Sequence, residues 1–212
     1  MEPCILSDKM KLYEFPYAPN PRRVRIFMAE KGIDLPRVAV DVLGKETRTA
    51  EFSKINSLGQ VPVLQLEDGT LISESVAICR YLEELRPAPA LFGSDAKSRA
   101  QVEMWNRRME SEIFGTIGNV GLHSDEFFKG KIAQVPAFSD AQRKAAPEKW
   151  AWLDRELADG RPFIAGEQFS VADITGMVAS WLGGHLKIEI PASLTHVHRW
   201  HERMRARPSW SA

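Results

Sequence analysis

Residues 48–75 carry groups that suit the recognition of a small zwitterionic peptide. Pro62 stands at the start of an apolar run, and because proline cannot donate to a strand ladder, it belongs at the edge or end of a sheet. If the Val61-Pro62 bond is cis, the N–H and C=O of Val61 can point outward and pair with an extended peptide, as an added strand would. An ordinary proline at the start of a strand is the alternative.

Glu74 and Ser75 stand where a helix over residues 75–85 is expected to begin. The free N–H groups and the positive end of a helix attract a carboxylate, while Glu74 can bind an ammonium group. Together they would hold the head group of an amino acid. Ser75 is also a natural N-cap, which is a role that needs no ligand.

Arg48 lies within the weakly helical stretch at 46–55, and Gln60 lies in the loop that follows it. A lone arginine is ordinarily just solvated, but a tripeptide held at Val61 has a second carboxylate that arginine can bind bidentately. Gln60 can donate to the same ligand from the loop before Pro62. These residue types and their spacing therefore indicate a peptide-binding site.

The hydrophobic pattern of the N-terminal part predicts a mixed α/β domain that would hold these groups. Asn20 followed by Pro21 is a helix-start signal with Asn20 as the N-cap, and Gly32 ends that helix. Asp68-Gly69 between two apolar runs predicts a β-hairpin. Strands are expected at residues 11–15, 36–41, 61–66 and 70–72, and helices at 21–31, 46–55 and 75–85.

The C-terminal part shows only helical patterns, and all six tryptophans lie there. Residues 97–114 place apolar side chains on one helix face, whereas 115–138 is looser, interrupted by glycines and Pro136. Ser170 and Asp173 form a capping signature for a helix that is central to a second core. Further helices are expected at 141–157, with a kink or break at Pro147, and at 193–207.

Composition limits the possible partners and location. Of the 212 residues, 28 are Lys or Arg and 28 are Asp or Glu, so the net charge favours neither nucleic acid nor an anionic membrane. No apolar run can span a bilayer, no export signal is visible, and Cys4 and Cys79 form no disulfide framework. A cytoplasmic, reduced protein is expected.

The predicted parts of the chain are an unstructured N-terminal extension at 1–9, an α/β domain at 10–87, a linker at 88–95 and a helical domain at 96–212.

Several motifs resemble those of cytosolic glutathione transferases, in their bacterial type. They are the segments 19–32, 52–64 and 73–78, the capping pair Ser170 and Asp173, and the closing Arg207-Pro-Ser209. The resemblance implies an α/β thioredoxin-like N-terminal domain plus an all-α C-terminal helical domain. It also implies a homodimer that uses glutathione as co-substrate, with no metal or prosthetic group.

The same resemblance implies roles for the residues of the site. Val61 would pair with the cysteinyl backbone of glutathione, with Pro62 cis. Glu74 and Ser75 would hold the γ-glutamyl end. Gln60 and Arg48 would face the glycyl end.

The catalytic position departs from the family pattern. Tyrosine-type classes have their tyrosine at the position that matches Glu14, and serine- and cysteine-type classes have theirs at the position that matches Ala18. Neither residue supplies a hydroxyl or a thiol. Asn20 resembles the asparagine of bacterial nu-class relatives, whose motif also reads Pro-Asn before the helix.

Typical free-energy contributions indicate whether Asn20 can lower the pKa of the glutathione thiol enough to give a thiolate at neutral pH. A free thiol has a pKa of about 8.5, so a thiolate at neutral pH needs a drop of about two units, or about 2.7 kcal/mol. A helix N-terminus contributes about 0.3–1 kcal/mol, and a hydrogen bond to a charged acceptor about 1.5–3 kcal/mol. A helix plus one N–H donor therefore reaches the target, whereas a helix alone does not. N-capping competes for the Asn20 side chain, and Tyr17 is the second possible donor if its ring turns inward.

The second substrate would meet the helical domain. Met104, Arg108 and Ser111 lie opposite the apolar stripe of the 97–114 helix and form a candidate pocket wall. A solvent or dimer face is the alternative. Phe127 and Phe128 either cover this pocket or pack in a small core.

We therefore expect a glutathione transferase that activates glutathione as a thiolate for attack on a small electrophile. The alternatives are a glutathione-dependent disulfide oxidoreductase and a protein that binds glutathione without turnover.

Overall fold

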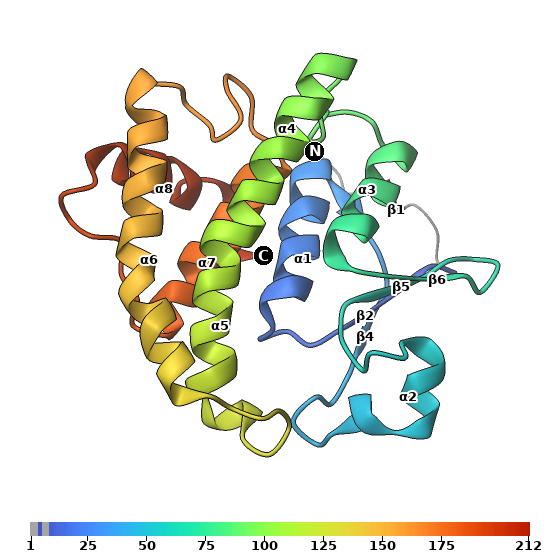
Figure 1. Ribbon diagram of the computed structural model, residues 1–212. Helices are drawn as coiled ribbons and strands as arrows, with labels where there is room; N and C mark the ends of the chain where they lie inside the picture. Colours follow the sequence, from blue (N-terminus) through green and yellow to red (C-terminus); the bar gives the residue numbers. More distant parts are fainter. Residues whose placement is uncertain (1–3, 6–8) are drawn as a thin grey trace. The chain divides into compact units, whose positions relative to one another are not determined.

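The computed structural model describes residues 4–5 and 9–212. The chain forms two compact units, Met1–Ala90 with Ser211–Ala212 and Leu91–Trp210. The first unit combines a small mixed sheet with helices, and the second unit is helical (Figure 1). This architecture confirms the fold class predicted from the sequence.

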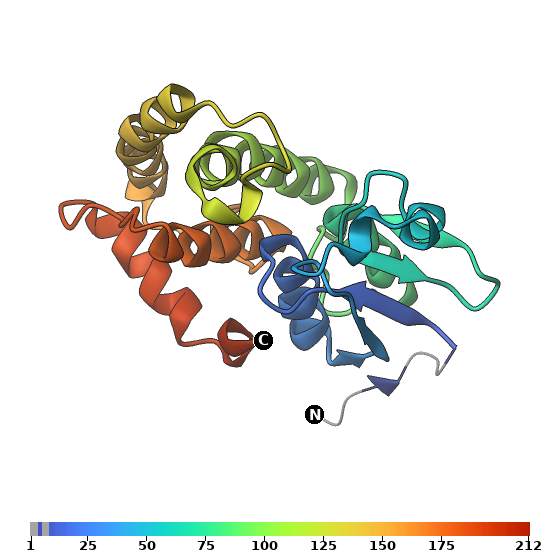
Figure 2. The ribbon, with the colours of Figure 1, turned by 90° about the horizontal axis from the view of Figure 1, so that it is seen from below.

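Four strands of the first unit form one sheet in the order β4-β2-β5-β6 (Figure 2). Strand β2 (Lys11–Glu14) runs parallel to β4 (Arg37–Ala39) and antiparallel to β5 (Val63–Gln65), which pairs antiparallel with β6 (Leu71–Ser73). The parallel pair is connected through α1 (Pro19–Lys31), because parallel strands need a crossover of this kind. The predicted strand–helix–strand unit is therefore present.

Strands β5 and β6 form the predicted hairpin. The backbone N–H of Thr70 donates to Asp68 Oδ1 at 2.9 Å, which closes the turn locally. Gly69 has a φ of 86°, a left-handed conformation that glycine adopts without steric cost. The Asp-Gly pair thus supplies both the turn hydrogen bond and the turn geometry.

Helices surround this sheet and share its core. Helix α3 (Ser75–Leu85) packs against α1 and against β5 and β6. The predicted 46–55 helix is split into a 3₁₀ turn, η1 (Glu46–Arg48), and α2 (Ala50–Ile55), because the hydroxyl of Thr49 caps α2 by accepting from the Phe52 N–H at 3.1 Å. Side chains with no exposed surface in this core include Leu12, Val24, Ile26, Phe27, Val63, Leu64, Ile78, Cys79 and Leu82.

The start of α1 differs from the prediction. The helix begins at Pro19 with Ala18 as its N-cap residue, and not at Pro21 with Asn20 as the N-cap. Pro19 suits the first helical position because its φ is preset and no N–H is needed there. Asn20 consequently occupies the second helical position. The helix ends at Gly32, with a φ of 59°, as predicted.

The predicted N-terminal extension contains a short strand. Strand β1 (Cys4–Ile5) pairs in parallel with β3 (Ile33–Asp34), so the prediction of an unstructured segment is wrong for these two residues. Residues 1–3 and 6–8 lie outside the described part of the chain.

The first helices of the second unit also differ from the prediction. Helix α4 (Ala96–Arg108) passes into a π-helical segment, η2 (Met109–Phe114), and then into α5 (Gly115–Ser124), where a loose segment was expected. A Cβ added at Gly121 would lie 3.3 Å from Leu186 Cδ1. The glycine thus permits close packing, and tertiary contact rather than helix propensity decides the structure here.

Helix α6 (Pro136–Glu156) begins at Pro136 and continues through Pro147, so the break expected at Pro147 is absent. Pro147 is exposed, and water can hydrate the carbonyl that loses its helical partner. The remaining elements are η3 (Glu126–Phe128), η4 (Leu157–Asp159), α7 (Val171–His185), α8 (Thr195–Arg205) and η5 (Pro208–Ser211).

Asp173 organises the core of the second unit. One carboxylate oxygen accepts from the N–H of Ser170 at 2.9 Å, and the other accepts from the Ile164 N–H and from Trp200 Nε1, both at 2.9 Å. The bond from the Ser170 N–H belongs to the predicted capping box, which is present at the start of α7. Together the three bonds satisfy a carboxylate with no exposed surface, which would otherwise be costly to bury.

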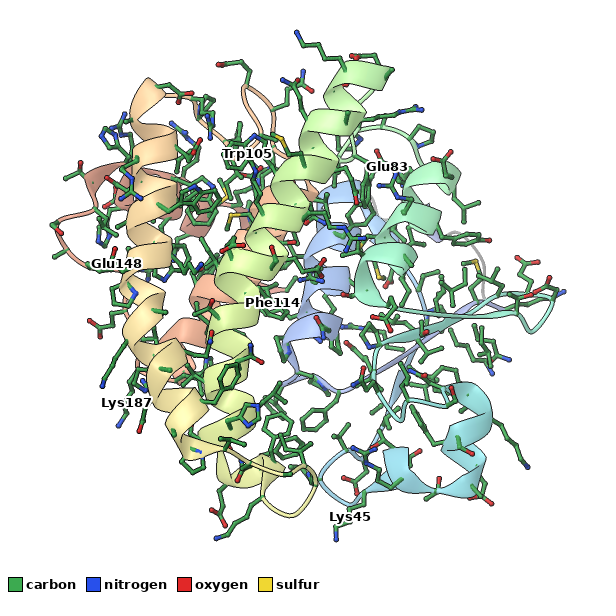
Figure 3. The ribbon with its side chains drawn as sticks, viewed as in Figure 1. Lys45, Glu83, Trp105, Phe114, Glu148 and Lys187 are labelled. Atoms are coloured by element: carbon green, nitrogen blue, oxygen red, sulfur yellow. The ribbon has the colours of Figure 1, made fainter. Side chains whose placement is uncertain are left out.

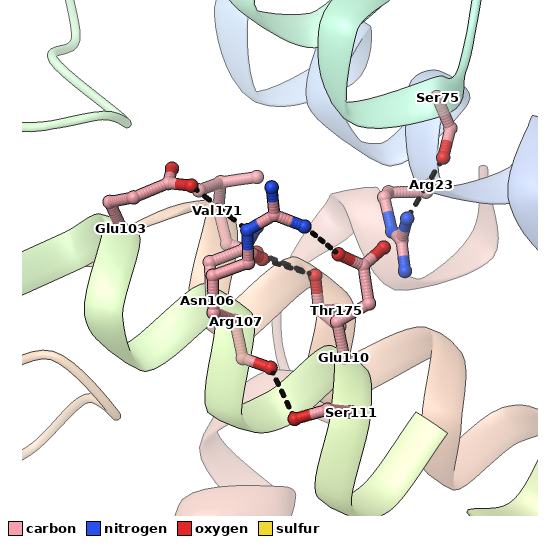
Figure 4. A network of polar contacts seen from close by, with 9 residues as sticks. All are labelled: Arg23, Ser75, Glu103, Asn106, Arg107, Glu110, Ser111, Val171 and Thr175. Atoms are coloured by element: carbon pink, nitrogen blue, oxygen red, sulfur yellow. Dashed lines mark hydrogen bonds and ion pairs between the residues drawn. The ribbon is translucent and has the colours of Figure 1, made fainter. Parts of the chain in front are cut away.

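Two further contacts join the helices of this unit. Trp105 projects from α4 (Figure 3) and stacks on Trp152 of α6 at a ring-centroid distance of 6.0 Å. Thr175 of α7 donates to Asn106 Oδ1 of α4 at 2.6 Å (Figure 4). The predicted apolar stripe of α4 and η2 is therefore the packed face.

Candidate functional site

The loop between α2 and β5 is held by Asn56, a buried residue that ends α2. Its Nδ2 donates to the carbonyl of Gln60 at 2.9 Å, and its Oδ1 accepts from the Leu58 N–H at 3.1 Å. The Gly59 N–H donates to the Asn56 backbone carbonyl at 2.9 Å. One buried side chain therefore determines the course of the chain up to Gln60.

Val61 stands just before the sheet. The Val61-Pro62 bond is cis, as predicted. Val63 is the first residue of the ladder, where it pairs with Tyr13 on one side and Ser73 on the other. Because Val61 precedes that pair, its N–H and C=O are outside the ladder and can meet an extended peptide at this end of the sheet.

Arg48 lies beside the same loop. A Cβ at Gly59 would be 2.6 Å from the Thr47 carbonyl oxygen and 3.3 Å from Arg48 Nη1. Gly59 also has a φ of 62°, so both the close approach and the backbone conformation require glycine. The structure thus brings the exposed Arg48 guanidinium next to the backbone that leads to Gln60.

The start of α3 corrects the predicted role of Ser75. Glu74 is the N-cap residue, and Ser75 is the first helical residue. The Ser75 hydroxyl is buried and accepts a hydrogen bond from Arg23 Nη1 at 2.9 Å (Figure 4). Glu74 is exposed and has a φ of 67°, which is uncommon for a residue with a side chain and costs about 1–3 kcal/mol. Strain of this kind is typical of functional sites.

Tyr17, between β2 and α1, and Asn20, in the first turn of α1, have different surroundings. Tyr17 is 77% exposed, and its ring contacts Phe15 edge-to-face at 5.6 Å. Asn20 is half-buried, and its side chain makes no hydrogen bond to any residue in the described ranges 4–5 and 9–212. Ala18, the N-cap residue, has no side-chain donor or acceptor. The capping role expected to compete for Asn20 is therefore absent.

Glu14, which the resemblance noted in the sequence matches to the tyrosine of tyrosine-type classes, is engaged in ion pairs. Its side chain is 6% exposed, Oε2 accepts from Arg25 Nη1 at 2.6 Å, and Oε1 lies 3.7 Å from Arg37 Nη1. The second donor of the fork, Arg25 Nη2, binds the carbonyl of Pro16 at 2.8 Å. Glu14 is thus a structural carboxylate at the end of β2.

Met104 and Arg108 lie in the second unit, on the exposed side of α4. Met104 is 40% exposed, and the Arg108 guanidinium lies 4.9 Å from the centre of the Trp105 ring. Ser111 donates to the Arg107 carbonyl at 2.9 Å. These side chains share one exposed face, as predicted, and their proposed contact with a second substrate stays a prediction.

Phe127 and Phe128 belong to the short η3 turn. Their rings meet edge-to-face at 4.8 Å, and Lys131 Nζ lies 3.4 Å from the centre of the Phe127 ring. Both phenylalanines are half-buried. Their aromatic contact is local, within the loop between α5 and α6.

Cys79 is not a candidate nucleophile. It lies one turn after Ser75 on the inner side of α3 and has no exposed surface. Burial raises the pKa of its thiol to about 12. Because the thiolate is the reactive form, this cysteine is inert at neutral pH.

Within residues 4–5 and 9–212, no group of three or more His, Cys, Asp or Glu side chains is arranged to hold a metal ion. The helices of the same ranges include none with the length and apolar character needed to cross a membrane.

Sequence reasoning missed the residues that support the site. These residues are Asn56, Arg23 and Arg25. The sequence alone does not distinguish an arginine that becomes buried in the fold from neighbouring arginines that stay solvated. The signal for Asn56 was present, because asparagine two residues before Leu58-Gly59 favours an Asx turn. The partners of Arg23 and Arg25 lie 52 and 11 residues away, so no local pattern indicates them.

Comparison with protein families finds two matches along the chain. Residues 17–85 match the model described as "Glutathione S-transferase, N-terminal domain", and residues 126–208 match "Glutathione S-transferase, C-terminal domain".

Individual proteins agree with these matches. The chain is 32% identical over 208 residues to "Glutathione S-transferase 2" of Saccharomyces cerevisiae, covering 96% of this chain and 89% of that protein. It is 41% identical over 171 residues to "Maleylacetoacetate isomerase" of Rattus norvegicus, covering 79% and 75% of the two chains. The crystal structure of a glutathione S-transferase domain-containing protein from Marinobacter aquaeolei VT8 superposes with a TM-score of 0.90 at 38% identity, covering 94% of this chain and 99% of that chain.

Proposed function

The chain belongs to the glutathione S-transferase family, and on that basis we propose that it activates glutathione as a thiolate for attack on a small electrophile. Relatives of this family support a glutathione-dependent activity. The residues that bind glutathione and the donor that stabilises its sulfur are parts of this proposal.

Glutathione is proposed to bind along the edge formed by Arg48, Gln60, Val61, Glu74 and Ser75. The Val61 backbone, which precedes the ladder, would pair with the cysteinyl residue. Arg48 lies beside the loop that carries Gln60, so both can reach the glycyl carboxylate. This arrangement follows from the loop held by Asn56.

The γ-glutamyl end is assigned to the start of α3. Arg23 donates to the Ser75 oxygen, so the hydroxyl proton of Ser75 is free to donate to a carboxylate. The N–H groups of the first helical turn add further donors. The exposed carboxylate of Glu74 can bind the ammonium group of the same ligand.

Asn20 is proposed as the donor to the glutathione sulfur. The observation that carries this assignment is that its side chain caps no helix and bonds no other residue in the described ranges 4–5 and 9–212. Pro19 and Pro21 lack N–H groups, so Asn20 provides the backbone N–H of the first three helical positions. Its amide and backbone N–H groups are therefore available to a thiolate, each hydrogen bond being worth about 1.5–3 kcal/mol.

In the proposed reaction, the glutathione thiol loses its proton to solvent, and the sulfur lone pair forms a bond to an electrophilic carbon. The bond from that carbon to the leaving group breaks, and its electron pair departs with the leaving group. Asn20 contributes by lowering the thiol pKa, which raises the fraction of thiolate at neutral pH.

Titration of the thiolate absorbance of bound glutathione tests this proposal. We expect a thiol pKa below about 7 in the wild-type complex, compared with about 8.5 for a free thiol. The same protein should conjugate a chlorinated aromatic compound. Reduction of hydroxyethyl disulfide without conjugation would favour a disulfide oxidoreductase, and glutathione binding without either activity would favour a binding protein.

A second candidate reaction is a glutathione-dependent isomerisation. The similarity to the maleylacetoacetate isomerase of Rattus norvegicus favours it. Reversible addition of a thiolate to a conjugated cis double bond makes the bond single, allows rotation, and releases the trans product with no group transferred. Turnover of maleylacetoacetate that exceeds conjugation of all electrophiles tested would favour this candidate.

Assembly and role are proposed from the family alone. We propose a cytoplasmic homodimer that acts on electrophiles in detoxification, with no nucleic acid or membrane partner. Light scattering after size-exclusion chromatography should give about twice the 23.9 kDa mass of one chain.

A further inference from the structure

Arg25 connects three parts of the first unit through one guanidinium group. Arg25 itself belongs to the second turn of α1. Its Nη1 donates to Glu14 Oε2, at the end of β2, at 2.6 Å. Its Nη2 donates to the backbone carbonyl of Pro16, in the following turn, at 2.8 Å. The planar fork of arginine suits two such bonds at fixed angles.

The turn that Arg25 binds leads directly to the proposed sulfur donor. Pro16 and Tyr17 are exposed, and the Ala18 N–H donates to the Phe15 carbonyl at 3.0 Å to close the turn. Ala18 is then the N-cap residue of α1, two positions before Asn20. A shift of the Pro16 carbonyl would therefore move the start of the helix that carries Asn20.

The contact between Arg25 and the carboxylate of Glu14 is strong because both side chains are charged and shielded from water. The Glu14 side chain is 6% exposed and the Arg25 side chain 11% exposed, so the pair is shielded from water. Arg37 reaches the same carboxylate from a longer distance, 3.7 Å, with a side chain that is 54% exposed. Hydrogen bonds between charged groups are shorter and stronger than neutral ones, and shielding from water adds to their strength.

We propose that Arg25 is a positioning residue for catalysis, which holds the turn at Pro16 so that Asn20 meets the glutathione sulfur. This inference rests on the proposed role of Asn20. Arg25 acts through Glu14 and the Pro16 carbonyl. Glutathione is proposed to bind elsewhere, along the edge formed by Arg48, Gln60, Val61, Glu74 and Ser75. Loss of the Arg25 fork should consequently impair thiolate formation and leave glutathione affinity nearly unchanged.

The main test compares Arg25→Lys with Arg37→Lys. Lysine keeps the charge at both positions, but an ammonium group cannot reproduce the fork that binds Glu14 and Pro16 together. We expect Arg25→Lys to raise the pKa of the bound thiol by about one unit and to lower kcat/KM about tenfold below that pKa. Glutathione Kd should change less than about twofold. Arg37→Lys, which touches the same carboxylate but not the turn, should match the wild type in every measurement.

The double variant Asn20→Ala/Arg25→Lys tests the route of the effect. If Arg25 acts through Asn20, the double variant raises the thiol pKa no further than Asn20→Ala does, whereas an additive shift overturns the inference. A shift in Asn20→Ala with none in Arg25→Lys overturns the inference alone. No shift in Asn20→Ala overturns the proposed role of Asn20 and this inference together.

A second variant covers the case in which Arg25→Lys does not fold. Glu14→Gln keeps an acceptor for Arg25 but replaces the charged hydrogen bond by a weaker neutral one. We expect a smaller rise in the thiol pKa, in the same direction. A thiol pKa equal to that of the wild type in this variant would overturn the inference.

Discussion

The edge at Asn56–Ser75 and the turn at Phe15–Asn20 are built in different ways. Along the edge, buried side chains hold the chain in place: Asn56 donates to the Gln60 backbone carbonyl, and Arg23 donates to the Ser75 hydroxyl. The turn is held at its backbone, where Arg25 donates to the Pro16 carbonyl, whereas the side chains of Tyr17 and of Asn20, in the first turn of α1, form no hydrogen bond to the described ranges 4–5 and 9–212. We infer that residues of the edge contribute to folding and binding together, whereas Asn20 is available for chemistry at little cost in stability.

Among the substitutions considered, Gly59→Ala should cause the largest losses of stability and of glutathione affinity. The new Cβ would approach the Thr47 carbonyl oxygen to 2.6 Å at a φ of 62°, so we expect a loss of about 2–4 kcal/mol in the free energy of unfolding. Glutathione affinity should fall more than about tenfold, because the loop that leads to Gln60 must move. Urea unfolding and calorimetric titration measure the two quantities.

Gly69→Ala is the matched control for that variant. Gly69 also has a positive φ, of 86°, but an added Cβ would meet nothing within 4 Å. We expect a loss of about 1–2 kcal/mol from backbone strain and an unchanged glutathione Kd. Equal losses of affinity in the two variants would contradict the role given to the loop at Gly59.

Ser75→Ala should have the next largest effect. It removes the acceptor of a buried hydrogen bond from Arg23, and we expect a loss of about 1–3 kcal/mol in the free energy of unfolding. Glutathione Kd should rise about tenfold while the pKa of the bound thiol stays the same. Ser75→Thr keeps the hydroxyl and should retain most of the affinity. A Kd unchanged in Ser75→Ala would remove Ser75 from the binding site.

Asn20→Ala should separate catalysis from stability. Its side chain bonds no residue in the described ranges 4–5 and 9–212, so the free energy of unfolding should change by less than about 0.5 kcal/mol. The loss of one hydrogen bond to the thiolate should raise the thiol pKa by about 1–2 units. The rate at pH 6.5 should then fall and recover as the pH rises through the new pKa. A large loss in the free energy of unfolding would show that Asn20 contributes to folding, as the residues of the edge do.

Tyr17→Phe should have the smallest effect. The ring is 77% exposed and rests on Phe15, a contact that phenylalanine keeps. We expect the thiol pKa to change by less than about 0.3 units, as measured by the thiolate absorbance. A rise of a full unit would instead make Tyr17 the donor to the sulfur.

Local sequence signals were sufficient for several elements in both units. Asp68-Gly69 predicted the hairpin, Gly32 the end of α1, and Ser170 with Asp173 the capping box of α7, because each motif acts within a few residues. Prolines were less decisive, since a proline fits several positions. Pro19 displaced Asn20 from the N-cap, and Pro147 did not end α6.

Taken alone, the sequence determined the fold class and the types of residue that line the proposed site. Periodicity and turn chemistry are local properties, so they can be read along the chain. Only the tertiary structure decided how these residues are used. In the structure, the buried Arg23 donates to Ser75, and Glu14 forms an ion pair with Arg25. The Asn20 side chain has no hydrogen-bond partner in the described ranges 4–5 and 9–212. Such partners lie 52 or 11 residues apart, and their choice depends on packing that no local pattern records.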